Sequence, residues 1–127
     1  MLGYVMVGTN NMAKAADFYD KILAELGASR TMEEESFIAW GTGKGKTDFS
    51  ITTPNDGNAA TVGNGSMMAF YAPDNATVDK IYAMALELGG TCEGPAGLRP
   101  EYAPNFYAGY FRDLDGNKMN VFHYPLG

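Results

Sequence analysis

Few side chains in this sequence belong to the types that usually carry catalysis or bind metal ions. His123 is the only histidine and Cys92 the only cysteine. One histidine cannot build a His-rich metal site, and a place near the end of a strand indicates that His123 packs against or caps the sheet. Nothing in the sequence brings Cys92 and His123 together as nucleophile and base, so Cys92 is interpreted as a buried structural thiol. These residue types identify no catalytic residue.

Two glycine-containing turns resemble ligand-binding motifs but lack essential parts of them. The segment Trp40–Thr47 ends like a phosphate-binding loop, yet a tryptophan stands where the first glycine belongs and a strand follows in place of a helix. The segment Asp113–Asn117 has the residue types of a calcium loop, but it lacks the length and the closing glutamate. Both segments are therefore predicted to be turns.

The loop Gly97–Tyr107 is the strongest candidate for ligand contacts outside the strands. Arg99 could bind a carboxylate or phosphate through two parallel hydrogen bonds, with Tyr102 and Tyr107 as aromatic walls. In the alternative, Arg99 pairs with Glu101 or another surface acid and the tyrosines cover the edge of the core. The sequence leaves both interpretations open.

The elements that must position these residues occur twice. Apolar residues recur at helical spacing in Ala15, Phe18, Tyr19, Ile22, Leu23 and Leu26, and again in Val78, Ile81, Tyr82, Ala85 and Leu88. Asn10 or Asn11 can cap the first helix, and Gly27 supplies a left-handed stop. An apolar strand precedes each helix, and the second unit begins about 63 residues after the first.

The predicted fold class is α+β, with tandem βαβββ units that form a curled mixed sheet, a concave cleft and helices on the outer faces. We expect a single domain over residues 1–127, with pseudo-repeats at about 1–56 and 64–127 and a turn-rich connector between them. The alternation of side chains along strands predicts which residues face the concave trough. These are Tyr4 and Met6 on the first strand, Met67 and Ala69 on the first strand of the second half, and Asn120 and Phe122 on the last strand.

Three segments together resemble a known family. They are Gly8–Met12 after the first strand, the helix containing Ala16–Tyr19, and the turn Asp113–Lys118 before the last strand. In order and spacing they are similar to the glyoxalase, bleomycin-resistance and extradiol dioxygenase superfamily, also called the vicinal oxygen chelate fold. The resemblance runs over essentially the whole chain.

The resemblance also indicates where a metal ion would lie. Metal-using members hold a divalent ion through His, Gln or Glu on the first strand of each half and Glu on the last strand. The matching positions here are Tyr4, Met67 and Asn120. A phenol, a thioether and an amide offer such an ion too little charge and donor strength, so we predict no metal site and no cofactor. Asn120 would then orient a ligand by hydrogen bonding, or satisfy a neighbour such as Tyr4.

Composition limits the partners. The chain has 15 acidic and 9 basic residues and a net charge of -6, which disfavours nucleic acids and anionic membranes. One cysteine cannot form an internal disulfide, and the first residues resemble neither a signal peptide nor a membrane span, so a cytoplasmic location is expected. A homodimer is compatible with the sequence and not required by it.

The favoured function is a metal-free binding protein for a small, largely apolar or aromatic molecule, as in antibiotic-sequestering relatives. Two alternatives are a lyase or isomerase resembling lactoylglutathione lyase, with an unusual metal site or metal-free acid–base chemistry, and a non-catalytic dimeric interaction module. The predicted ligand contacts are Tyr4, Met6, Trp40, Met67, Arg99, Tyr102, Tyr107, Asn120 and Phe122.

Overall fold

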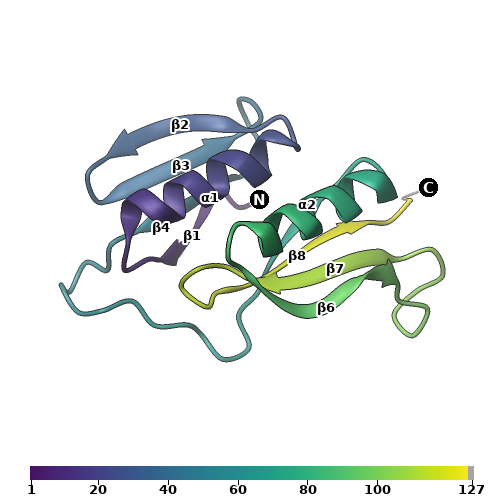
Figure 1. Cartoon of the computed structure of the whole chain (residues 1–127). Coiled ribbons are helices and arrows are strands. Elements are labelled where there is room, and N and C mark those ends of the chain that lie inside the picture. The colour runs from purple at the N-terminus through teal and green to yellow at the C-terminus, as the bar shows by residue number, and fades with distance from the viewer. Residues whose placement is uncertain (126–127) are drawn as a thin grey trace. The chain divides into compact units, whose positions relative to one another are not determined.

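The chain forms two compact units that repeat one arrangement of elements (Figure 1). The structure is a computed structural model that describes residues 1–125. The first unit is Met1–Gly63, and the second starts at Asn64. Each unit has one helix and one four-stranded mixed sheet, so the predicted tandem of βαβββ units is confirmed.

In the first unit the strands lie in the order β1-β4-β3-β2. Strands β1 and β4 run parallel, whereas the other neighbours are antiparallel. The elements are β1 (Tyr4–Gly8), α1 (Met12–Ala24), β2 (Ser29–Glu34), β3 (Phe37–Gly41) and β4 (Asp48–Thr52).

The second unit repeats this topology, with the strand order β5-β8-β7-β6 and one parallel pair, β5 with β8. Its elements are β5 (Met68–Tyr71), α2 (Asn75–Glu87), β6 (Thr91–Leu98), β7 (Tyr107–Arg112) and β8 (Lys118–His123). Within residues 1–125, no helix is long and apolar enough to cross a membrane.

A side-chain cap begins each helix, and for α1 it is one of the two predicted asparagines. The side chain of Asn11 accepts a hydrogen bond from the amide of Lys14 and caps α1, while Asp74 caps α2 by accepting from Thr77. After α1 the chain reverses at Gly27, whose φ of 77° lies in the left-handed region that glycine adopts without strain.

An aromatic cluster joins α1 to one face of the first sheet. The ring of Tyr19 lies 5.8 Å from that of Trp40 and 4.7 Å from that of Phe49, and all three side chains are buried. Nε1 of Trp40 donates a 2.8 Å hydrogen bond to Asp20, which also accepts from Arg30 on β2. The indole N–H of Trp40 is therefore hydrogen-bonded to the ion pair of Asp20 with Arg30.

In the second unit, α2 packs on one face of its sheet in the same way. Val78, Ile81 and Ala85 of the predicted stripe are buried. A Cβ atom on Gly109 of β7 would lie 3.0 Å from the ring of Tyr82, so this glycine lets helix and sheet approach closely. Tyr107 lies on the same side of β7 and donates its hydroxyl proton to Asp79 of α2, and this bond raises the pKa of the phenol.

Strand β6 is longer than the sequence indicates. The sequence indicates a short strand near Thr91–Glu93 and a loop over Gly94–Pro104, whereas the structure has one strand from Thr91 to Leu98 and the loop begins only after it. Its pairing with β7 shifts register between Cys92 and Gly94 and again before Gly97. Because β6 is an edge strand, it tolerates bulges and a proline that a central strand would exclude.

The turn between β7 and β8 has the predicted position. Oδ1 of Asp113 accepts hydrogen bonds from the amides of Asp115 and Asn117, and Gly116 has a φ of 89°. His123 has the packing role expected of it, with Nδ1 2.9 Å from the carbonyl of Ala72. The interpretation of Cys92 as buried was wrong: its thiol is exposed and accepts a hydrogen bond from Tyr82.

The charge of Asp20 should contribute to stability in a pH-dependent way. The hydrogen bond from Arg30 holds the pKa of Asp20 below its ordinary value of 3.8. This stabilisation is present above the ordinary pKa and is lost as the pH falls through the lower, folded-state pKa. We expect Asp20→Asn to lower the free energy of unfolding by roughly 1 kcal/mol at neutral pH, and the difference from wild type to shrink below about pH 4.

Urea unfolding at the two pH values measures this difference. Asp17→Asn is the matched control on the same helix, because Asp17 pairs with Lys21 on the surface. This substitution should lower the free energy of unfolding by at most about 0.5 kcal/mol. Equal losses in the two variants would contradict the role given to Asp20.

The close approach of Gly109 to Tyr82 makes a second prediction. Gly109→Ala should lower stability by about 1 to 3 kcal/mol relative to Gly3→Ala, since the added methyl group crowds the Tyr82 ring, whereas Gly3 has open space around it. Thermal unfolding of the two variants measures the difference. If both variants unfold at the same temperature, helix and sheet are not in the close contact described.

Candidate functional site

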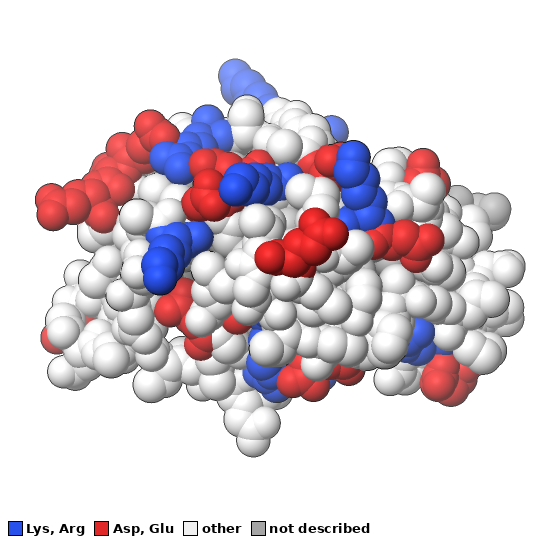
Figure 2. Space-filling model, in the orientation of Figure 1, with Lys and Arg blue, Asp and Glu red and all other residues white. Residues whose placement is uncertain are grey.

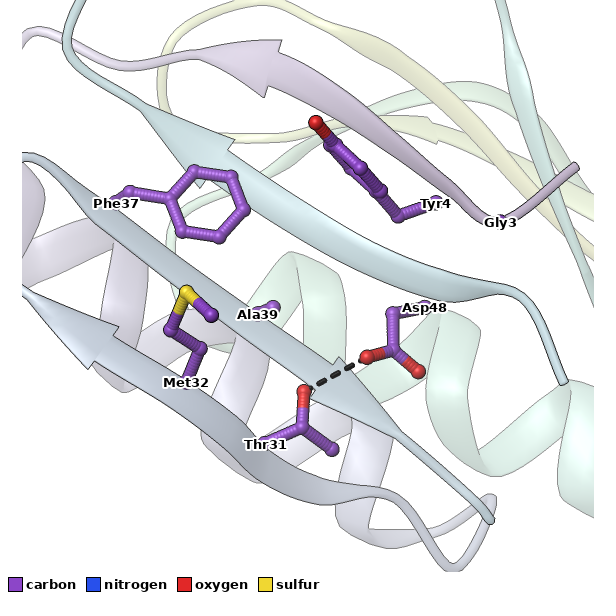
Figure 3. A pocket seen from close by; sticks show the side chains of 7 residues that line it. All are labelled: Gly3, Tyr4, Thr31, Met32, Phe37, Ala39 and Asp48. Carbon is purple, nitrogen blue, oxygen red and sulfur yellow. Dashed lines mark hydrogen bonds between the residues drawn. The ribbon is translucent and has the colours of Figure 1, made fainter. Parts of the chain in front are cut away.

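A hollow lies on the face of the first sheet opposite α1 (Figure 3). Its volume is about 290 Å³. Strand alternation accounts for the lining, because Ile38, Trp40 and Phe49 face the helix and their neighbours in sequence face the other way. We call it the first-sheet hollow, and its lining residues are Gly3, Tyr4, Thr31, Met32, Phe37, Ala39 and Asp48.

A bulge in β2 supplies two of these residues. Arg30 pairs with Trp40 and Met32 pairs with Ala39, so Thr31 is an extra residue in the ladder. As a result, the neighbours Thr31 and Met32 both line the hollow, as Figure 3 shows. The bulge thereby places two consecutive side chains on one face of the strand.

The walls of the hollow are mainly apolar. The rings of Tyr4 and Phe37 meet edge to face, with centroids 6.1 Å apart and planes at 83°. The flexible thioether of Met32 stands beside them. Tyr4 is 60% exposed and Met32 is 50% exposed, so both present apolar surface that a ligand can cover.

One carboxylate provides the polar end. Oδ2 of Asp48 accepts a 2.8 Å hydrogen bond from the hydroxyl of Thr31, drawn as the dashed line in Figure 3. Oδ1 of Asp48 rests against Gly41, where an added Cβ would lie only 2.1 Å from it. Glycine at position 41 therefore leaves room for a carboxylate that can accept a hydrogen bond from a ligand.

The predicted residues of the first unit divide between the two faces of its sheet. Tyr4 and Met6 are exposed on β1 while Val5 and Val7 between and after them are half-buried, in agreement with strand alternation. Tyr4 lines the hollow and Met6 does not. Trp40 is only 1% exposed and packs under α1, so a ligand on the opposite face cannot reach it.

In the second unit, Asn120 and Phe122 lie on the face of β8 opposite α2. Asn120 pairs with Tyr110 of β7 and is 3% exposed, and within residues 1–125 its Oδ1 atom has no hydrogen-bond partner. Met67 lies immediately before β5 and is exposed.

The loop residues have different positions from one another. Arg99 pairs with neither Glu101 nor any other described acid; its guanidinium donates to the carbonyls of Pro95, Gly97 and Leu98. Tyr102 is exposed and packs edge to face on Phe106. Tyr107 points to the helix side of its sheet, as its bond to Asp79 requires, and not to the face that carries Asn120.

Sequence reasoning missed most of the first-sheet hollow. Strand alternation applied to β3 and β4 would have found Phe37, Ala39 and Asp48, since their neighbours Ile38 and Phe49 are clearly core residues. It would not have found Thr31 and Met32 together, because a bulge breaks the alternation and leaves no clear mark in the sequence.

The positions that hold a metal ion in related proteins do not fit one here. Tyr4, Met67 and Asn120 supply a phenol, a thioether and an amide, which are poor ligands for a divalent ion. Across residues 1–125 there is also no group of three or more His, Cys, Asp or Glu side chains that could replace them.

Comparison with known proteins identifies the family. The sequence model of the Glyoxalase/Bleomycin resistance protein/Dioxygenase superfamily matches residues 1–121. A search of curated proteins finds no match. A crystal structure of a glyoxalase/bleomycin resistance protein from Albidiferax ferrireducens T118 is 37% identical and has a TM-score of 0.88, with 98% of this chain and 99% of that chain covered.

Two more distant structures share the fold. A glyoxalase-related enzyme from Fulvimarina pelagi is 17% identical, with a TM-score of 0.75 and coverage of 100% of this chain and 92% of that one. A lactoylglutathione lyase from Agrobacterium tumefaciens is 19% identical, with a TM-score of 0.68 and coverage of 97% and 92%. At these identities the likeness concerns the fold alone. With its sequence matched over nearly the whole length, this chain belongs to the glyoxalase/bleomycin resistance protein/dioxygenase superfamily.

Proposed function

We propose that this protein binds a small, largely apolar or aromatic molecule in a cleft that needs no metal ion. The observation that carries the proposal is the first-sheet hollow, with Tyr4, Met32 and Phe37 as walls and Asp48 as its polar end. Ligand sites are typically concave and apolar, with a few polar groups that fix orientation. The hollow has this character.

The size and chemistry of the hollow suggest the kind of ligand. A volume of about 290 Å³ lies near the lower limit for small-molecule sites, so a molecule with about one ring is a suitable size. An aromatic ring can pack against the Tyr4–Phe37 pair and the Met32 sulfur. A hydroxyl or ammonium group on that ring can donate to Asp48.

No particular observation favours an enzyme over a binding protein. The likeness to lactoylglutathione lyase supports a common fold, and function does not follow from fold alone. A cytoplasmic location and a homodimer stay predictions from the sequence. Figure 2 shows acidic and basic side chains interspersed on the face drawn, with no broad basic patch there, which agrees with a small molecule as the partner.

Metal analysis tests the metal-free part of the proposal. We expect protein purified without chelators to contain far less than one zinc, nickel, iron or manganese ion per chain, because Tyr4, Met67 and Asn120 are poor ligands. Elemental mass spectrometry of desalted protein measures the content. One tightly held ion per chain would overturn this prediction.

Titration with matched aromatic probes tests the hollow. We expect benzylamine to bind more tightly than benzyl alcohol, and benzoate most weakly, because Asp48 attracts a cationic donor and repels an anion. Phe37→Ala should weaken all binding by about tenfold through lost apolar contact. Asp48→Asn should remove the preference for benzylamine. Chemical shifts of backbone amides in two-dimensional NMR give both affinity and location.

Met6→Ala is the control for this titration, since Met6 lies on the same strand and the same face as Tyr4 but outside the hollow. It should bind the probes as wild type does. The proposed use of the hollow is wrong if shift changes avoid Thr31 and Phe37, or if Asp48→Asn keeps the preference for benzylamine.

A further inference from the structure

Two cationic side chains gather around one tyrosine on the second sheet. The guanidinium carbon of Arg99 lies 5.5 Å from the ring centroid of Tyr110, and Nζ of Lys118 lies 5.9 Å from the same centroid. Tyr110 is on β7, Lys118 is on β8, and Arg99 follows β6. Three neighbouring segments thus bring two positive charges to one aromatic ring.

These residues lie on the face of the sheet opposite α2. Tyr110 pairs with Asn120, and Ala108 pairs with Phe122, so these side chains share a face. The alternate residues Tyr107 and Gly109 face α2, as their contacts with that helix demonstrate.

The two cations are not neutralised by acids of the described chain. Arg112, a third cation nearby on β7, is paired with Glu93, and the pKa of Glu93 is lowered mainly by that hydrogen bond. Lys118 makes no ion pair within residues 1–125 and acts on Glu93 only at longer range. Arg99 donates only to uncharged carbonyls. Two unpaired cations beside one ring are notable in a chain of net charge -6.

Hydrogen bonds within the protein hold the guanidinium of Arg99 in place before any ligand binds. Carbonyls of the bulged strand β6 accept from Nη1 and Nη2, at 2.6 Å for Pro95 and 3.0 Å for Gly97. A Cβ on Gly94 would lie 3.2 Å from Nη2, so the guanidinium packs directly on this glycine. Its Nε–H and one N–H of Nη2 have no acceptor within the described residues, and they can bind an anion at little cost in ordering.

The same face also carries a buried amide oxygen that lacks a hydrogen-bond donor among residues 1–125, which indicates that a ligand bound here would supply one. Asn120 is 3% exposed, yet its Oδ1 atom has no hydrogen-bond partner in the described part of the chain. A buried acceptor without a donor destabilises the folded protein unless something else supplies the donor. Asn120 lies next to Tyr110 across the strand pair, so the missing donor belongs to the same place as the cations.

An aromatic wall follows Asn120 along β8. The ring of Phe106 stacks on Phe122 at 5.5 Å and 16°, and Tyr71 meets Phe122 edge to face at 5.5 Å. Lys118, Asn120 and Phe122 are two residues apart in turn, which corresponds to about 7 Å per step along a strand. This face therefore presents a cation, an amide oxygen and an aromatic surface in order.

We propose that the second sheet binds a small aromatic carboxylate that carries a hydrogen-bond donor between its ring and its carboxylate. The carboxylate contacts Arg99 and Lys118, the donor contacts Oδ1 of Asn120, and the ring packs on Phe122 and Tyr71. We call this the second-sheet site. It is built from the second unit only and does not depend on the first-sheet hollow.

Three probes that differ in one group each test the site. They are 3-phenyllactate, 3-phenylpropionate without the hydroxyl, and 3-phenyl-1,2-propanediol without the carboxylate. We expect 3-phenyllactate to bind at least tenfold more tightly than either of the others, with an affinity that falls as salt is added. Its binding should shift the side-chain amide signals of Asn120 in two-dimensional NMR and leave Thr31 unchanged.

Substitutions test which side chain contacts the carboxylate of 3-phenyllactate and which contacts its hydroxyl group. Arg99→Gln should weaken 3-phenyllactate about tenfold or more and leave the diol unaffected, whereas Lys80→Gln, which removes a charge on α2, should change neither. Asn120→Ala should remove the advantage of 3-phenyllactate over 3-phenylpropionate while the melting temperature stays the same or rises, since an unpaired acceptor is lost. A purely structural Asn120 would instead lower the melting temperature.

The proposal is overturned if no binding is detected with 3-phenyllactate at about millimolar concentration and in about tenfold excess over the protein. It is equally overturned if the diol binds as tightly as the acid, or if Arg99→Gln has the wild-type affinity. Because the readout is at Asn120, failure here leaves the result for the first-sheet hollow unaffected, and the reverse also holds.

Discussion

One helix can cover only one face of a four-stranded sheet, and this limit decides which side chains of the protein can meet a ligand. In each unit the covered face takes the apolar residues, because burial away from water is the main favourable term in folding. The other face is released from that demand. Its residues can be aromatic or charged without cost to the core, as Tyr4, Asp48 and Lys118 are.

In each unit one face of the sheet is not covered by the helix, and we call it the open face. The two open faces carry different kinds of side chain although the two sheets have the same topology. The first carries an aromatic pair, a thioether and a carboxylate, which suit an apolar molecule with a donor group. The second carries two unpaired cations, an unpaired amide oxygen and stacked aromatic rings. Bulges shape both: one in β2 places Thr31 and Met32 together, and those in β6 supply the carbonyls that hold Arg99.

Glycines mark the places where backbone and polar groups come close. Gly41 leaves space for the carboxylate of Asp48, and Gly94 leaves space for the guanidinium of Arg99. In both cases the absence of a Cβ leaves room for a charged side chain on the face that the helix does not cover. Gly109 likewise leaves room on the covered face, where Tyr82 of α2 approaches the sheet.

The sequence by itself determined the repeat, the apolar stripes of both helices, the caps of the first helix, the turn at Asp113 and the faces of Tyr4 and Asn120. These follow from interactions within a few residues, namely helical and strand periodicity and the hydrogen bonds of caps and turns. Only the tertiary structure decided that Tyr107 belongs to a covered face, that Arg99 lies over Tyr110, and that Thr31 and Met32 share a hollow. Those outcomes depend on bulges and on strand pairing, which join residues that are distant in the chain and which periodicity does not record.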